Sequence, residues 1–266
     1  LAIFGPTKEA AMLETSKAYA KEVMVASGVP TAKYQVFTEY ETAGDAISEW
    51  DFPLVIKVDG LAAGKGVIIC ESKEETLATL KEIFIDQKFG GAGQKVLIEE
   101  FLTGQEISAF SFVDGENISP VIGATDYKRA YDGDKGPNTG GMGSYSPPKV
   151  WNNDIENTII ENVFEPVIGY MRSIGNPYTG VLYAGLIVTS DGIKVLEFNC
   201  RFGDPETQVL LPRLETDLLS VMQHTATLDI TGIDIKWDPS PCVGLVVASG
   251  GYPESYNVGK NIHGLD

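Results

Sequence analysis

The segment VIKVDGLAAGKGVIIC, residues 55–70, constrains the fold of this chain more than any other stretch. It looks like a phosphate-binding P-loop, which requires Gly, four residues and then Gly-Lys-Ser/Thr at the start of a helix. Here only three residues separate Gly60 from Gly64, and Gly66 stands where the P-loop needs a hydroxyl residue. Residues 67–70 are apolar and mostly β-branched, which favours a strand. The segment therefore predicts a β-hairpin and not a P-loop.

Composition limits the partners that this chain can have. Its 266 residues, of which 43% are hydrophobic, suffice for one large core or two domains. A net charge of −17 disfavours sequence-independent binding of nucleic acid. Apolar runs fall short of the roughly 20 residues that span a bilayer, so we expect neither a nucleic-acid nor a membrane partner. The cysteines, Cys70, Cys200 and Cys242, are too far apart for a zinc site or a disulfide framework, which favours a cytoplasmic protein. We expect a monomer.

Periodicity and turn signals predict alternating helices and strands. The strand-like segments are PLVIKV, GVIIC and KVLIEEF, and Asp-Gly pairs at 114–115 and 191–192 predict two hairpins. The predicted helices cover residues 7–27, 74–86, 153–174 and 215–228. Thr7 is the expected N-cap of the first helix, and Gly28 its stop. The polar stretch 126–148 is expected to be a long loop that acts as a lid or binds a ligand.

This organisation divides the chain into four parts. We expect a linker helix at 1–32, a small αβ lobe at 33–103 and a main body at 104–230. Residues 231–266 are expected to be a linker and the start of a truncated C-terminal domain, because a strand-like run begins there and the chain then stops.

Two lysines accompany the glycine-rich hairpin. Glycines let backbone amides approach phosphate oxygens, and the ammonium groups of Lys57 and Lys65 would offset phosphate charge. A surface hairpin with solvated lysines fits the same residues, so both interpretations stay open.

The stretch LIEEFLTGQE, residues 97–106, has the features of a purine-binding edge. A strand end can offer backbone donors and acceptors to a purine, and Glu106 can accept hydrogen bonds from two ribose hydroxyls. A solvated turn is the alternative.

The most unusual stretch is VLEFNCRFGDPETQ, residues 195–208. Alternate side chains of a strand share a face, so Glu197 and Asn199 point together and Arg201 follows them. A carboxylate and an amide oxygen suit magnesium, and an arginine can bind a phosphate or a carboxylate with two hydrogen bonds. The alternative is an internal ion network, which is costly to bury.

The polar stretch 126–148 offers further charged groups, and histidine chemistry is not indicated. Asp126 and Lys128 precede the glycine-rich GPNTGGMGSY, which would close over a substrate and exclude water; a merely flexible surface loop is the alternative. The two histidines, His224 and His263, stand outside any catalytic motif. Cations, magnesium and positioning would therefore carry the chemistry, as in phosphoryl transfer.

Five motifs occur in a characteristic order: VIKVDGLAAGKGV, IEEFLTGQE, GPNTGGMGSYSP, TGVLYAGLIV and VLEFNCRFGDPETQ. In this combination the chain closely resembles the phosphoribosylamine–glycine ligase family of the ATP-grasp superfamily, over nearly its whole length. The resemblance implies an α+β ATP-grasp fold, in which two αβ lobes hold ATP between two mainly antiparallel sheets. The glycine-rich hairpin would then be the flap over the ATP phosphates.

The resemblance also implies roles for individual residues. ATP would be bound by Lys17, Lys57, Gly64, Lys65, Gly66, Glu99, Glu100, Phe101, Leu102 and Glu106. Magnesium or manganese would be bound by Glu197 and Asn199, the substrates by Asp126, Asn138, Gly141 and Asp204, and Arg201 and Lys128 would be catalytic.

The implied reaction joins glycine to 5-phosphoribosylamine at the expense of ATP, through a glycyl phosphate, in purine biosynthesis. All partners would thus be small molecules. Tyr127 stands where the family usually has histidine, so any role of that histidine does not transfer. The family's N-terminal domain is missing here, from which we expect weak turnover. Another ATP-grasp ligase or carboxylase, or an ATP-binding fragment without turnover, are the alternatives.

Overall fold

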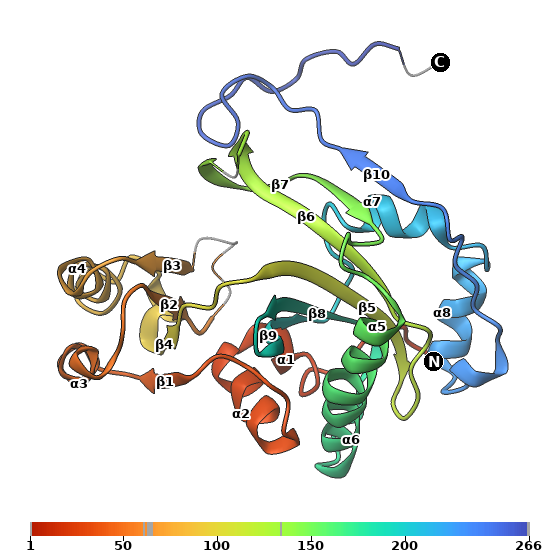
Figure 1. The fold of residues 1–266 in the computed structure, drawn as a ribbon, viewed down its shortest axis with the longest axis horizontal. Helices are drawn as coiled ribbons and strands as arrows, with labels where there is room; N and C mark the ends of the chain where they lie inside the picture. Colours follow the sequence, from red (N-terminus) through yellow and green to blue (C-terminus); the bar gives the residue numbers. More distant parts are fainter. Residues whose placement is uncertain (1, 61, 63–65, 134, 265–266) are drawn as a thin grey trace.

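The computed structural model describes residues 2–60, 62, 66–133 and 135–264 (Figure 1). Its strands form a four-stranded sheet in the order β1-β4-β2-β3 and a six-stranded sheet in the order β10-β7-β6-β5-β8-β9. All neighbouring strands in both sheets pair antiparallel. The expected α+β fold with two mainly antiparallel sheets is confirmed.

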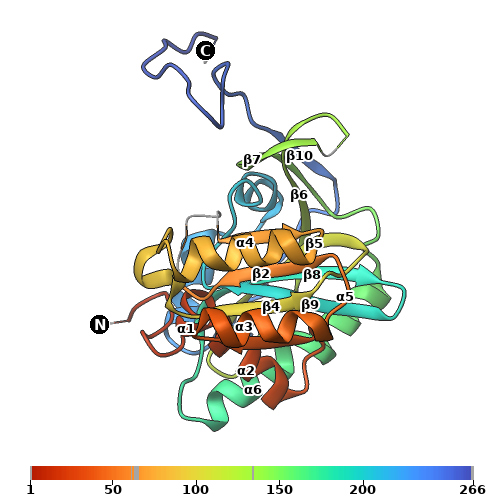
Figure 2. The same cartoon turned by 90° about the vertical axis from the view of Figure 1, so that its left-hand side faces the viewer.

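The four-stranded sheet carries its helices on one face. Figures 1 and 2 show α3 and α4 on the side that points away from the rest of the molecule, where they share a buried core with β2 and β4. The elements are β1 (Tyr34–Phe37), α3 (Tyr40–Ala46), η1 (Ile47–Glu49), β2 (Leu54–Val58), β3 (Val67–Cys70), α4 (Lys73–Phe84), η2 (Gly90–Gln94) and β4 (Val96–Glu100).

The glycine-rich segment forms the predicted hairpin. β2 pairs with β3 from Leu54 opposite Cys70 to Lys57 opposite Val67. A strand therefore follows the glycines, which excludes a P-loop. Gly66 cannot be replaced without movement, because a Cβ there would lie 2.5 Å from a methyl of Val58. Two predicted phosphate-binding residues of the turn, Gly64 and Lys65, lie outside the described residues.

The six-stranded sheet is covered on both faces. α2, α5 and α6 pack on one buried core, and α7 and α8 pack on another core across the sheet (Figure 1). The strands are β5 (Gln105–Asp114), β6 (Ile122–Tyr131), β7 (Lys135–Ser146), β8 (Thr179–Thr189), β9 (Gly192–Asn199) and β10 (Cys242–Leu245). The helices are α1 (Met12–Thr15), α2 (Lys17–Ser27), α5 (Asn153–Ile159), the π-helical η3 (Ile160–Phe164), α6 (Glu165–Ser173), α7 (Thr207–Leu210), η4 (Leu211–Arg213), α8 (Leu218–Ala226) and η5 (Ile230–Gly232).

Hairpins form at both Asp-Gly pairs, as predicted. In the second hairpin the turn residues are Ser190 and Asp191, and Gly192 pairs directly with Thr189 with a φ of +115°, which glycine adopts without strain. Gly115 likewise has a φ of +100°, and Asp114 accepts the backbone N–H groups of Glu116 and Asn117. The predicted helices at 74–86, 153–174 and 215–228 are present, with ends that differ by up to three residues, and the second of them has a π-helical turn in its middle.

The prediction of a long loop at 126–148 was wrong. Most of this stretch belongs to β6 and β7, which form a protruding hairpin, with β10 pairing along the far side of β7. Glycine in this stretch allows neighbouring strands to approach closely. A Cβ on Gly143 would lie 2.7 Å from the carbonyl oxygen of Gly244. Register shifts between Tyr127 and Tyr131 bend the hairpin.

The prediction of one helix at 7–27 was also wrong, since Ser16 is extended and separates α1 from α2. Ser16 caps α2 by accepting the N–H of Tyr19, and Asp59 accepts the N–H of Ala18 at 2.7 Å. A carboxylate at a helix N-terminus is favourable, so the break joins α2 to the end of β2. Gly28 ends α2 as predicted, with a φ of +75°. In the described part of the chain no helix is long and apolar enough to cross a bilayer.

Candidate functional site

A cavity of about 240 Å³ opens where the two sheets meet. Its wall combines α1 and α2 with the β2–β3 hairpin, β4 and β9, and carries charged side chains of both signs. These charged residues are Glu14, Lys17, Lys21, Lys57, Glu99, Glu197 and Arg201. Most of them come from segments that are far apart in the sequence, so the cavity exists only because the two sheets are held together.

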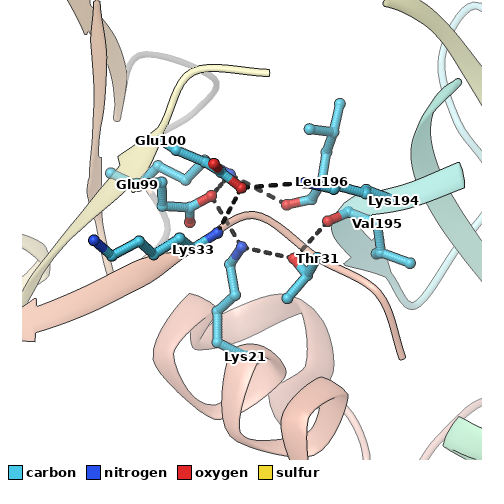
Figure 3. Close-up of polar contacts among 9 residues, drawn as sticks. Lys21, Thr31, Lys33, Glu99, Glu100, Lys194, Val195 and Leu196 are labelled. Atoms are coloured by element: carbon cyan, nitrogen blue, oxygen red, sulfur yellow. Dashed lines mark hydrogen bonds and ion pairs between the residues drawn. The ribbon is translucent and has the colours of Figure 1, made fainter. Parts of the chain in front are cut away.

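Glu99 of β4 lies at the centre of this charge cluster (Figure 3). One of its oxygens, Oε2, lies 2.9 Å from Nζ of Lys21 and 3.0 Å from Nζ of Lys57. The three side chains are at most 9% exposed. Two ammonium groups around one carboxylate leave the buried cluster with an excess of positive charge, which suits a polyanionic ligand.

Lys17, at the first position of α2, adds to the positive charge of the cavity. Burial lowers the pKa of Lys17, and the charge of Glu197 opposes that shift. The break at Ser16 sets this position, because it starts α2 beside the loop that follows β2.

The end of β9 and the segment that follows it bring the three predicted residues Glu197, Asn199 and Arg201 together. Nδ2 of Asn199 lies 3.5 Å from Oε1 of Glu197, and NH2 of Arg201 lies 3.4 Å from Oδ1 of Asn199. Nε of Arg201 also pairs with Glu14 at 3.0 Å. Gly185 on the neighbouring strand leaves room for Glu197, since a Cβ there would lie 3.1 Å from Cγ of Glu197.

The donor set on β9 fits magnesium or manganese. Among the residues that the structure describes, no group of three or more His, Cys, Asp or Glu gathers as a metal centre. Magnesium is usually held by one or two protein oxygens together with substrate phosphates, and Glu197 and Asn199 supply such a pair beside the lysines.

Lys128 and Asp126 lie on β6, beyond the wall of the cavity. Their charged groups are 3.7 Å apart, and the side chain of Lys128 is half-exposed. Partial burial opposes the charge of Lys128, but Asp126, Glu197 and Glu106 together raise its pKa. Lys128 therefore stays protonated and faces the carboxylates of the sheet.

The remaining predicted substrate-binding residues lie on β7 and in the segment that follows β9. Asn138 is exposed on β7, opposite Arg129. Gly141 packs against Pro205, and Asp204 accepts a hydrogen bond from Gln208 at 2.7 Å. None of these three lines the cavity in the described structure.

The predicted purine edge at Glu99–Leu102 leads out of the cavity. The carboxylate of Glu99 is committed to the lysines, whereas Glu100 accepts the N–H of Lys33 at 2.9 Å and contacts Nζ of Lys194 at 3.3 Å. Phe101 is 40% exposed, and Glu106 is exposed on β5.

Lys21 and Glu206 were not among the site residues predicted from the sequence. Lys21 follows Lys17 by four residues, so both share one face of a helix, and that spacing was the available signal. Glu206 is 2% exposed and accepts a hydrogen bond from Ser108 at 3.1 Å. Burial, followed by the charge of Asp126, raises the pKa of Glu206. No local pattern marks Glu206, because its partners come from other strands.

Two antiparallel sheets around a lysine-rich cavity with a carboxylate–amide pair define an ATP-grasp domain. Distant solved structures share this fold: the biotin carboxylase domain of Hydrogenobacter thermophilus 2-oxoglutarate carboxylase has a TM-score of 0.69 at 19% identity, covering 91% of this chain and 52% of that one. At such identity the likeness concerns the fold alone.

The particular family follows from closer matches. The model described as "Phosphoribosylglycinamide synthetase, ATP-grasp (A) domain" matches residues 15–207, and the chain belongs to this family. The phosphoribosylamine–glycine ligases of Halalkalibacterium halodurans and Vibrio parahaemolyticus are 47% and 49% identical to it over all 266 residues. The solved structure of the Thermotoga maritima ligase has a TM-score of 0.86 at 38% identity, with 96% of this chain and 64% of that one covered. The chain spans 62% of the length of the two curated relatives.

Proposed function

We propose that this chain is the ATP-binding part of a ligase that joins glycine to 5-phosphoribosylamine. The products would be glycinamide ribonucleotide, ADP and phosphate, formed through a glycyl phosphate. Membership of the phosphoribosylglycinamide synthetase family and the names of relatives at 47% and 49% identity support the choice of substrates.

The observation that carries the proposal is the convergence of Lys17, Lys57 and Arg201 with Glu197 and Asn199 around one cavity. The lysines would bind the ATP phosphates together with Gly64, Lys65 and Gly66 of the flap. Donors fixed before the reaction stabilise the charge that develops during phosphoryl transfer. Arg201, which is hydrogen-bonded to Asn199, would orient the γ-phosphoryl group toward the glycine carboxylate.

Magnesium or manganese would be held by Glu197 and Asn199. When bound, the ion would neutralise phosphate charge and orient the transferred group. The part played by the chain is to present the two oxygens on one face of β9 and to keep Arg201 beside them.

The other predicted residues receive roles by their location. The backbone of Glu99, Glu100, Phe101 and Leu102 would bind adenine, and Glu106 the ribose. The substrates would be contacted along the β6–β7 hairpin by Asp126, Asn138, Gly141 and Asp204. The protonated Lys128 would attract the phosphate or carboxylate groups of the substrates. Closure of the glycine-rich flap would keep water away from the glycyl phosphate.

We also propose the division into a linker helix at 1–32, a small lobe at 33–103, a main body at 104–230 and the start of a further domain at 231–266. The separate hydrophobic core of the four-stranded sheet supports the bounds of the small lobe, whereas buried residues of 1–32 and of 231–266 share the two cores of the main body. The free cysteines Cys70, Cys200 and Cys242 support a cytoplasmic location, and we further propose a monomer that acts on small molecules.

The test is ADP release by this chain with ATP, magnesium, glycine and phosphoribosylamine, and with each component omitted. Release that requires all four components supports the proposal. Release that requires bicarbonate instead of glycine would favour an ATP-grasp carboxylase. ATP binding without any release would identify an ATP-binding fragment that needs the rest of the protein.

A further inference from the structure

The ion cluster around Glu99 (Figure 3) already engages Lys57, which the proposed function requires as a phosphate ligand. Its Nζ is bound to Oε2 of Glu99 at 3.0 Å and to the carbonyl oxygen of Leu196 at 3.2 Å. If Lys57 binds a phosphate of ATP, as proposed above, its ammonium group has to leave Glu99. A buried carboxylate that loses its only counter-ion is strongly destabilised, so a single Lys57–Glu99 pair would resist nucleotide binding.

Lys21 supplies a second counter-ion at the same oxygen. Its Nζ lies 2.9 Å from Oε2 of Glu99, and its side chain is 2% exposed. Because the carboxylate is shared, Glu99 keeps one positive partner whichever way Lys57 points.

Lys21 is also held more firmly than Lys57. Its Nζ donates to Oγ1 of Thr31 at 2.8 Å, and that hydroxyl donates in turn to the carbonyl oxygen of Val195 at 2.7 Å. The ring of Tyr34 lies 5.4 Å from the same ammonium group. The hydrogen bonds through Thr31, drawn as dashed lines in Figure 3, tie Lys21 to β9, and the ring contact ties it to β1.

We propose that Lys21 is a positioning residue: it is the permanent counter-ion of Glu99 and so releases Lys57 to bind a phosphate of ATP. The inference rests on the proposed function, because it presumes that ATP binds in this cavity. It deepens that function by giving Lys21 and Lys57 different roles at one carboxylate.

A double-mutant cycle on ATP affinity tests this role. Calorimetry with ATP and magnesium would give the dissociation constants of the wild type, Lys21→Met, Glu99→Gln and the double variant. We expect Lys21→Met to weaken ATP binding at least tenfold, because among the described residues Lys57 is then the only counter-ion of Glu99. In the Glu99→Gln background the same change should alter the affinity less than twofold, since no carboxylate holds Lys57.

Lys33→Met is the matched control. Lys33 lies at the same junction of the sheets, but its Nζ lies 4.7 Å from the centroid of the Trp50 ring, whereas Lys21 and Lys57 form the ion pairs with Glu99. Its substitution should leave the affinity unchanged. Circular dichroism would establish that each variant is folded at the temperature of the titration.

Each outcome decides between the alternatives. An equal loss of affinity from Lys21→Met in both backgrounds, or a lower melting temperature with unchanged affinity, would overturn the inference in favour of a purely structural role. If Lys21→Met does not fold by itself, the comparison of Glu99→Gln with the double variant still tests the inference. A large difference in ATP affinity between these two variants would overturn it. Wild-type ATP binding with no effect of Lys21→Met would refute this inference alone, whereas no binding by the wild type would refute the proposed function with it.

Discussion

Asp114 and Glu206 are both buried carboxylates, yet their pKa values shift in opposite directions. For Asp114, burial opposes the charge, but the backbone N–H groups of Asn117, Ile230 and Glu116 donate to it and lower its pKa. For Glu206, burial prevails and the neighbouring Asp126 adds to it, so the pKa rises. The sequence predicted the turn at Asp114 from its glycine neighbour, but the bond to Ile230 joins residues that are far apart in the chain.

We predict that Asp114→Asn destabilises the protein at pH 7 by about 2 kcal/mol, because an amide donor then faces the N–H of Ile230 and the hydrogen bonds that remain lose their charged acceptor. The lowered pKa of the folded state means that this carboxylate stabilises the protein above its unfolded-state pKa. That stabilisation disappears as the pH falls through the folded-state pKa. Urea denaturation between pH 3 and pH 7 would measure it, and a constant difference from the wild type across this range would contradict the account.

Glu206→Gln should show the opposite dependence on pH. Because the pKa of Glu206 is raised in the folded state, its stabilisation is fully present below the unfolded-state pKa and is lost as the pH rises through the folded-state pKa. The variant should therefore gain stability relative to the wild type between acidic and neutral pH. The same urea series measures this, and a relative loss toward neutral pH would refute it.

At the scale of elements, local chemistry allowed some predictions and not others. The hairpin at 55–70 and the turn at Gly192 could be predicted because glycines and β-branched residues act within a few positions. β7 could not, since its glycine-rich sequence is held extended by pairing with β6 and β10. The break at Ser16 likewise depends on Asp59, 43 residues away.

Gly141 tests the contact between β7 and the segment that follows β9. It has a φ of +121°, and a Cβ there would overlap the ring of Pro205. We predict that Gly141→Ala lowers the free energy of unfolding by about 3 kcal/mol or more, through backbone strain combined with overpacking. Gly133 also has a positive φ, +71°, but in the described part of the chain nothing lies within 4 Å of its Cβ position. Gly133→Ala should therefore cost only about 1 kcal/mol of strain. Equal costs for both variants in urea denaturation would argue against the contact.

At the scale of the whole molecule, the site is a property of the junction between the two sheets. Lys57 reaches from β2 to the carbonyl oxygen of Leu196, and Lys194 reaches from β9 to Glu100 of β4. The shared face of Glu197 and Asn199 on β9, with Arg201 two residues beyond the strand, was predictable from spacing alone. The meeting of these residues with Lys17, Lys21 and Glu99 was not, because no local rule states which strands of two separate sheets will face each other.

The central claim is that this junction binds ATP with a metal ion held by β9. The most direct test is calorimetric titration with a non-hydrolysable ATP analogue, with and without magnesium. The variants are Glu197→Gln, which keeps the size of the side chain, and Glu161→Gln as a control at an exposed position. We expect that magnesium strengthens binding in the wild type and in the control, and that Glu197→Gln binds at least tenfold more weakly with magnesium present. Absence of binding by the wild type, or magnesium-dependent binding that survives Glu197→Gln, would contradict the central claim.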